Sequence, residues 1–233
     1  MIVSVHPAPD DLARATAAWL RERATAAAQR FAVCLAGGST PRRVYELLAS
    51  AERDRFPWDR VHWFFGDERF VPPDHPESNY RMAREALFAV APVPTGNVHP
   101  IPTAGAPATA AQRYEDELKD FYGAAALDPQ RPLFDVVLLG LGEDGHTASL
   151  FPGSAALQER RRWVVDALGP QSQPRITLTY PALASHHALA FLAVGAGKRA
   201  ILRRVWGGDD LPAARLRAGA HWFIDAAADP RAG

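Results

Sequence analysis

Residues 31–49, FAVCLAGGSTPRRVYELLA, contain the succession of elements that decides the fold. The apolar run Phe31–Leu35 predicts a buried strand, and the glycine pair after it ends that strand in a tight turn. The letters STP then indicate the start of a helix, because a hydroxyl side chain caps a helix and proline fits its first position. We expect this helix to reach about residue 49.

The same succession of strand, turn and helix recurs along the chain. Apolar runs predict further strands at 2–5, 61–65, 98–101, 134–139, 163–167, 175–179, 187–194 and 220–224. Helical spacing of apolar residues predicts further helices at about 12–29, 77–88, 108–121 and 198–205. This alternation favours an α/β fold with a mainly parallel sheet covered on both faces, plus one antiparallel pair formed by 163–167 and 175–179. We expect a single domain spanning residues 1–233, because this length suits one core.

Composition limits the partners and the compartment. Lys plus Arg number 26 and Asp plus Glu number 26, so no basic excess favours nucleic acid or an anionic membrane as a partner. The one cysteine, Cys34, lies inside a predicted strand and is expected to be a buried thiol in a reducing compartment. No positive leader and no apolar run of roughly 18 residues is present, which predicts a soluble cytoplasmic protein.

Four predicted strands end in turns that carry polar or charged residues. These turns lie at 37–41, 66–69, 140–147 and 195–198. Parallel strands present their carboxyl ends at one edge of a sheet, and ligands bind in the crevice there. We therefore expect the four turns to line one crevice.

The first of these turns, GGSTP, resembles a phosphate cradle. Glycines let the backbone approach an anion, the amides and dipole of the following helix attract it, and Ser39 and Thr40 add hydroxyl donors. Taken alone, the turn fits a plain strand-to-helix connection better, because short motifs arise by chance. Arg69 and Lys198 strengthen the phosphate hypothesis, since charge-assisted bonds contribute about 1.5 to 3 kcal/mol each. The alternative is that both cations are solvated surface groups.

The stretch LLGLGEDGHTASLFPGS, residues 138–154, places His146 in a glycine-rich turn directly after a predicted strand. An imidazole titrates near neutral pH and can act as a general base. Glu143 or Asp144 lies close enough in sequence to orient the ring, and the sequence leaves open which of them does so. A histidine that only caps the turn is the alternative, but glycines flanking an acidic pair favour an exposed, functional presentation.

Several other site classes are disfavoured. His186 and His187 are adjacent, but no third ligand stands at metal-site spacing nearby, so no zinc site is expected. The sequence contains no GxSxG elbow, no P-loop lysine motif and no GxGxxG fingerprint. These absences count against a serine hydrolase, a nucleotidase and a dehydrogenase.

Five segments resemble the 6-phosphogluconolactonases of the pentose phosphate pathway. They are LAGGSTPRRVYELL (35–48), WFFGDERFVPPDHPESNYRMAREALF (63–88), DVVLLGLGEDGHTASLFPGS (135–154), PRITLTYPAL (174–183) and GAGKRAILRRV (195–205). The string DGHTASLFPGS is highly specific to that family. GGSTP, and DER with HPES, are shared with the related glucosamine-6-phosphate deaminases, whose typical DGHIAFNEP this chain lacks.

The resemblance implies a three-layer α/β/α sandwich and hydrolysis of 6-phospho-D-glucono-1,5-lactone to 6-phosphogluconate. By matching motif, His146 is the base, Asp144 belongs to the same catalytic turn, and Arg69 and Lys198 grip the phosphate. The other binding residues that the resemblance implies are Gly38, Ser39, Thr40, Asp67, Asn79 and Arg175. Asp67 matches a proton-transfer carboxylate of the deaminases, but because lactone hydrolysis needs no enolising base, it has a binding or orienting role only.

Neither a metal nor an organic cofactor is implied. The resemblance implies a monomer whose partner is a small sugar-phosphate lactone, with no nucleic-acid or membrane partner. Two other functions stay open, a glucosamine-6-phosphate deaminase-like isomerase and a non-catalytic sugar-phosphate-binding module of the kind found in some transcription regulators. The second is disfavoured because only about 30 residues precede the first glycine turn, without a helix-turn-helix or basic patch.

Overall fold

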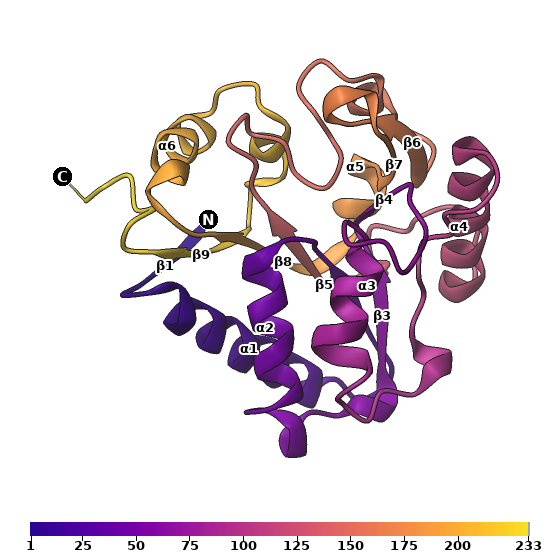
Figure 1. Cartoon of the computed structure of the whole chain (residues 1–233), viewed down its shortest axis with the longest axis horizontal. Coiled ribbons are helices and arrows are strands. Elements are labelled where there is room, and N and C mark those ends of the chain that lie inside the picture. The colour runs from indigo at the N-terminus through magenta and orange to yellow at the C-terminus, as the bar shows by residue number, and fades with distance from the viewer. Residues whose placement is uncertain (233) are drawn as a thin grey trace.

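A computed structural model describes residues 1–232 and contains a six-stranded sheet at its centre (Figure 1). In spatial order the strands are β1 Ile2–His6, β9 His221–Asp225, β8 His186–Ala193, β5 Phe134–Gly140, β2 Phe31–Leu35 and β3 Val61–Phe65. All five pairings are parallel. Every residue of β2 and most of β5 is buried, because helices cover both faces of this sheet. The predicted α/β class is therefore confirmed.

A second, antiparallel sheet stands beside the first. Its strands, in spatial order, are β4 Asp67–Arg69, β7 Pro174–Leu178 and β6 Val164–Leu168. Only Gly66 separates β4 from the end of β3, and its carbonyl accepts a 2.8 Å hydrogen bond from the amide of Leu178. The small sheet thus begins where β3 leaves the large one. The predicted pairing of β6 with β7 is confirmed, whereas part of the turn predicted at 66–69 is a strand.

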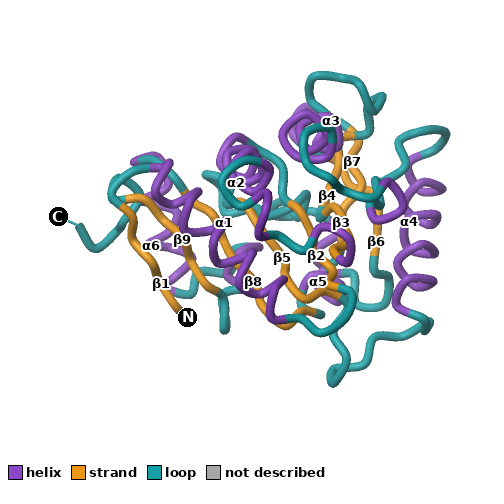
Figure 2. Tube along the Cα trace, turned by 90° about the horizontal axis from the view of Figure 1, so that it is seen from below, coloured by secondary structure: helices purple, strands orange, loops and turns teal. Residues whose placement is uncertain are grey.

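Helices connect the strands. They are α1 Pro9–Ala26, α2 Ser39–Ala49, α3 Asn79–Ala83, α4 Pro107–Tyr122, α5 Tyr180–Leu183 and α6 Arg199–Gly207. The short helical turns are η1 Arg53–Arg55, η2 Trp58–Arg60, η3 Arg84–Phe88 (a π-helical turn), η4 Thr95–Asn97, η5 Ala155–Gln158, η6 Pro170–Ser172, η7 Ala196–Lys198 and η8 Pro212–Leu216. Figure 1 shows α1 and α2 on one side of the large sheet and α6 on the other. Figure 2 shows α4 against the small sheet, where it contacts β6 and β7.

Two local predictions are wrong. Residues 98–101 form no strand, since only a single bridge joins Val98 to Trp63. Pro100 and Pro102 lack the amide hydrogens that a continuing ladder needs. The predicted hydroxyl cap of α2 is also absent, because the helix begins at Ser39 and Gly38, with φ of 106°, takes the cap position without a side-chain hydrogen bond.

Two further predictions concern Cys34 and membrane-spanning helices. Cys34 is fully buried, as expected, and burial raises the pKa of its thiol well above the ordinary range. Within residues 1–232, no helix combines the length and apolarity that crossing a bilayer requires.

Candidate active site

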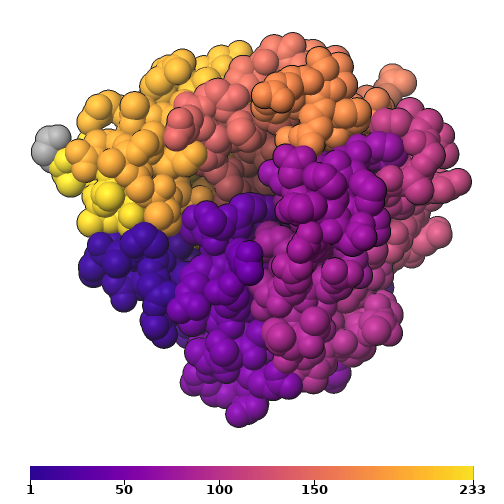
Figure 3. All heavy atoms as spheres, viewed as in Figure 1, coloured from indigo at the N-terminus to yellow at the C-terminus, as the bar shows by residue number. Residues whose placement is uncertain are grey.

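A cavity of about 350 Å³ opens at the carboxyl ends of β2, β3, β5 and β8. All four turns predicted to converge contribute lining residues, among them Gly38, Asp67, His146 and Lys198. The space-filling view shows a recess where the purple, salmon and orange parts of the chain meet (Figure 3). The convergence follows from topology, because these four strands are neighbours and parallel.

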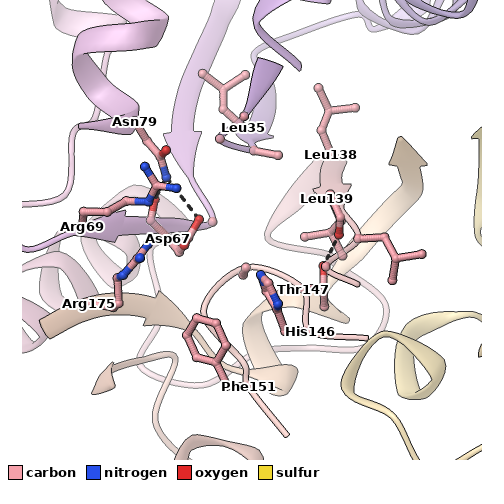
Figure 4. Close-up of a pocket in the computed structure, with 18 of the residues that line it drawn as sticks. Leu35, Asp67, Arg69, Asn79, Leu138, Leu139, His146, Thr147, Phe151 and Arg175 are labelled. Carbon is pink, nitrogen blue, oxygen red and sulfur yellow. Dashed lines mark hydrogen bonds between the residues drawn. The ribbon is translucent and has the colours of Figure 1, made fainter. Parts of the chain in front are cut away.

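His146 lies on the cavity wall with about a third of its side chain exposed. Its Nδ1 is 2.5 Å from Oδ1 of Asp144, and its backbone amide donates to the same oxygen at 3.0 Å. A carboxylate only accepts hydrogen bonds, so in the neutral ring Nδ1 carries the proton and Nε2 keeps the lone pair. The ring of Phe151 packs against the imidazole with centroids 4.7 Å apart (Figure 4). His146 is therefore held in the tautomer that a base requires.

Asp144, and not Glu143, is the carboxylate that contacts His146. Partial burial alone raises the pKa of Asp144, but the hydrogen bonds from the amide and ring of His146 outweigh it and hold that pKa below its usual value. Glu143 lies beside the neighbouring loop, where a Cβ added to Gly197 would come within 3.2 Å of its Oε1. The question that the sequence left open is answered by the direction of these two side chains.

Arg69 and Arg175 form a cationic wall across the cavity from His146 (Figure 4). They are directly opposed in the β4–β7 ladder, a placement in which like charges repel. Arg69 donates to the carbonyl of Glu77 and Arg175 to Oε1 of Gln173, but neither forms a salt bridge within the described chain. The buried Nε of each arginine also lacks a partner among residues 1–232.

The pKa of Arg175 reflects this crowding. Burial lowers it first, and the neighbouring charge of Arg69 lowers it further. Two adjacent guanidinium groups with unused donors, and no carboxylate partner, fit a bound anion of high charge such as a phosphate.

Asp67 and Asn79 lie next to Arg69 in the cavity wall (Figure 4) and are almost fully buried. Asn79 Nδ2 donates to the carbonyl oxygen of Asp67 at 2.9 Å and to its Oδ1 at 3.3 Å. Asn79 also packs tightly on Gly37, where an added Cβ would come within 2.1 Å of its Oδ1. Both residues line the cavity, and the hydrogen bonds between them fix the Asp67 carboxylate and the Asn79 amide in its wall.

The remaining predicted residues divide into two groups. Gly38 and Lys198 line the cavity, Lys198 as the last residue of η7. Ser39 and Thr40 form the start of α2 beside the cavity but do not line it. Asp144 likewise contacts His146 without lining the cavity.

Sequence reasoning missed two residues near the imidazole, Phe151 and Ser149. Ser149 is fully buried, and its Oγ donates to Oδ2 of Asp67 at 2.6 Å. Both lie in the motif around His146, but nothing in that string indicates a contact with a carboxylate 82 positions away. In the part of the chain that the structure describes, no group of three or more His, Cys, Asp or Glu side chains is arranged to hold a metal ion.

Comparisons with known proteins identify the family to which the chain belongs. A family model described as glucosamine-6-phosphate isomerases/6-phosphogluconolactonase matches residues 7–224. A 6-phosphogluconolactonase of Nostoc sp. is 43% identical over 206 residues, covering 85% of this chain and 83% of the relative. One of Synechocystis sp. is 45% identical over 175 residues, covering 75% and 70%. The solved structure of 6-phosphogluconolactonase from Thermotoga maritima has a TM-score of 0.83 at 32% identity and covers 96% of this chain and 99% of that chain.

Proposed function

Because the chain belongs to the family of glucosamine-6-phosphate isomerases and 6-phosphogluconolactonases, we propose that it hydrolyses 6-phospho-D-glucono-1,5-lactone to 6-phosphogluconate. This is the lactonase step of the oxidative pentose phosphate pathway, carried out here by a cytoplasmic monomer. The relatives that support it most strongly are named 6-phosphogluconolactonase. The observation that carries it is an imidazole with a free Nε2 on one side of a cavity and two arginines without carboxylate partners on the other.

Substrate binding relies on charge placed locally in a chain of zero net charge. Arg69 and Lys198 bind the phosphate, and Arg175 adds a second guanidinium beside Arg69. Charge-assisted contacts contribute about 1.5 to 3 kcal/mol each and a micromolar Kd corresponds to about 8 kcal/mol, so the three cations must act together with backbone amides to reach that affinity. Asn79 and Gly38 complete the binding surface, while Ser39 and Thr40 lie beside it at the start of α2.

The chemical step is a water attack assisted by one residue. Nε2 of His146 takes a proton from water as the water oxygen bonds to the lactone carbonyl carbon. The resulting imidazolium is stabilised by Asp144 and returns the proton to the ring oxygen as the ester C–O bond breaks. Proton transfer of this kind accelerates a reaction by about 10²- to 10⁴-fold. No covalent intermediate is required, and the buried Cys34 takes no part.

The deaminase alternative requires a carboxylate free to abstract a carbon-bound proton. Asp67 occupies the matching position, but it is 8% exposed and its two oxygens accept from Asn79 and Ser149. These contacts suit an orienting group better than a mobile base. This supports hydrolysis as the activity and leaves the deaminase as the competing outcome of the test.

An assay of the purified protein with two substrates tests the proposal. With the lactone at neutral pH, we expect acid release well above the spontaneous rate, and with glucosamine 6-phosphate we expect no ammonia. Ammonia release would establish the deaminase. Tight binding of 6-phosphogluconate with neither product formed would establish a binding module.

A further inference from the structure

The turn that follows the imidazole has an unusual backbone. Ala148, in the turn Thr147–Leu150, has a φ of 48°. A residue with a Cβ adopts this left-handed conformation only at a free-energy cost, and it persists where surrounding contacts fix it. Ala148 lines the cavity next to His146, so the strained residue lies at the reacting centre.

Hydrogen bonds on both sides of Ala148 fix the turn. Before it, Thr147 Oγ1 donates to the carbonyl of Gly140 at 2.9 Å, at the end of β5. After it, Ser149 donates through Oγ to Asp67 Oδ2 at 2.6 Å and through its amide to Thr177 Oγ1 at 3.2 Å. The hydrogen bond from Ser149 Oγ to Asp67 is the shortest of the three and reaches a residue of the small sheet.

The conformation leaves one backbone donor unused. Within residues 1–232 the amide of Ala148 has no hydrogen-bond acceptor, whereas Thr147 pairs with Leu150 in a single antiparallel bridge. Ala148 lines the cavity. Fixed amides at a reacting carbonyl stabilise the oxyanion that develops there, because they need no reorganisation as the charge appears.

Resting on the proposed lactonase activity, the structure assigns Ser149 as a positioning residue that acts through its hydrogen bond to Asp67. This bond holds Ala148 in its left-handed conformation and directs the Ala148 amide towards the lactone carbonyl oxygen. Asn79 holds Asp67 in place through two hydrogen bonds. Asp67 therefore orients the turn that contains Ala148 and transfers no proton. Without the Ser149 hydroxyl, Ala148 relaxes to negative φ and its amide turns away from the lactone carbonyl.

Ser149→Ala tests this assignment. We expect kcat for the lactone to fall about 10- to 100-fold, since positioned donors contribute mainly in the transition state, while KM and the Kd of 6-phosphogluconate stay within about threefold. Ser154→Ala is the matched control, because Ser154 lies in the same loop and its buried hydroxyl has no partner within the described residues. That variant is expected to keep the parent kcat.

A second variant distinguishes positioning from a general loss of folding. In an Ala148→Gly background, glycine adopts φ of 48° at no cost, so the turn depends less on its tether. We expect the loss of kcat caused by Ser149→Ala to be at least threefold smaller there. Equal losses in both backgrounds, or a parent kcat in Ser149→Ala, overturn the inference. A parent protein inactive on the lactone would instead refute the proposed function itself.

Discussion

At the scale of single residues, the state of one imidazole depends on one carboxylate. Asp144 contacts both the amide and Nδ1 of His146, and these hydrogen bonds keep its pKa below the ordinary value despite partial burial. A lowered pKa means that the carboxylate stays charged into mildly acidic solution. Asp144 therefore supports the imidazolium over the whole pH range in which the enzyme is expected to work.

Replacing this carboxylate tests its role. We expect Asp144→Asn to lower kcat about 10- to 100-fold, because an amide can present either an oxygen or an NH₂ group to Nδ1 and no longer stabilises the imidazolium. Steady-state kinetics with the lactone measure the effect. Glu143→Gln is the control, since Glu143 lies near Gly197, and it should change kcat by no more than about twofold. Equal effects of the two substitutions would contradict the assignment.

At the scale of elements, the loop after β5 delivers His146 through close contacts that only glycine allows. A Cβ added to Gly142 would lie 2.0 Å from His146 Nδ1 and 2.7 Å from Asp144 Oδ1. A Cβ added to Gly140, two residues earlier, would meet nothing within 4 Å. The two glycines therefore differ in a way that the sequence pattern alone cannot show.

This difference gives a paired prediction. Gly142→Ala is expected to displace the imidazole and reduce kcat by at least about 10²-fold, the lower limit of what general base catalysis contributes. Gly140→Ala is expected to lower kcat by less than Gly142→Ala does, because its Cβ meets no protein atom within 4 Å although Gly140 lines the cavity. Steady-state kinetics with the lactone measure kcat of both variants, and circular dichroism verifies that both fold. An active Gly142→Ala protein would show that the loop tolerates a shift of the ring.

The elements show where sequence reasoning succeeds and where it fails. Phe31–Leu35 and the strand at 61–65 were predicted to the residue, because continuous apolar runs indicate strands buried on both faces. The cap of α2 was not predicted correctly, because Gly38, with a positive φ, occupies the cap position for which STP suggests a hydroxyl side chain. The contact of Ser149 with Asp67 joins two loops distant in sequence, so only the folded chain reveals it.

At the scale of the whole molecule, parallel topology explains why the site forms at all. β3, β2, β5 and β8 are adjacent, so turns that are up to about 160 positions apart in sequence meet at one edge of the sheet. Convergence of the turns was predictable because the alternation of strands and helices indicates parallel strands, whose carboxyl ends lie at one edge of the sheet. The cationic wall was predicted only as separate residues, because the pairing of Arg69 with Arg175 depends on the register of β4 and β7.

Histidines distributed over the molecule predict acid sensitivity. Burial lowers the pKa of four of them, His6, His62, His186 and His221. The largest shift is at His62, whose pKa falls to about 4 because of burial first and then the neighbouring His99 and Arg30. Since the folded-state pKa lies below the unfolded value of 6.5, the unfolded chain binds more protons in between. Stability present above pH 6.5 is therefore lost as the pH falls towards 4.

Urea unfolding at pH 7 and pH 5 measures this effect. We expect the free energy of unfolding to be lower at pH 5, with His62 contributing about 1 kcal/mol after allowance for its partial exposure. His62→Gln should reduce the difference between the two pH values by about that amount. His187→Gln, at an exposed position of β8, should change the difference by less than His62→Gln does, because His187 acts only by lowering the pKa of its neighbour His186. An equal response of both variants would contradict the prediction.

The central claim is that His146 is the base in a cavity whose cations bind the phosphate independently of it. The most direct measurement compares His146→Ala with the parent in lactone turnover and in the affinity for 6-phosphogluconate. We predict that kcat falls by at least about 10²-fold while the Kd of 6-phosphogluconate changes by less than about threefold. Hydrolysis of the lactone at the parent rate by His146→Ala would contradict the account.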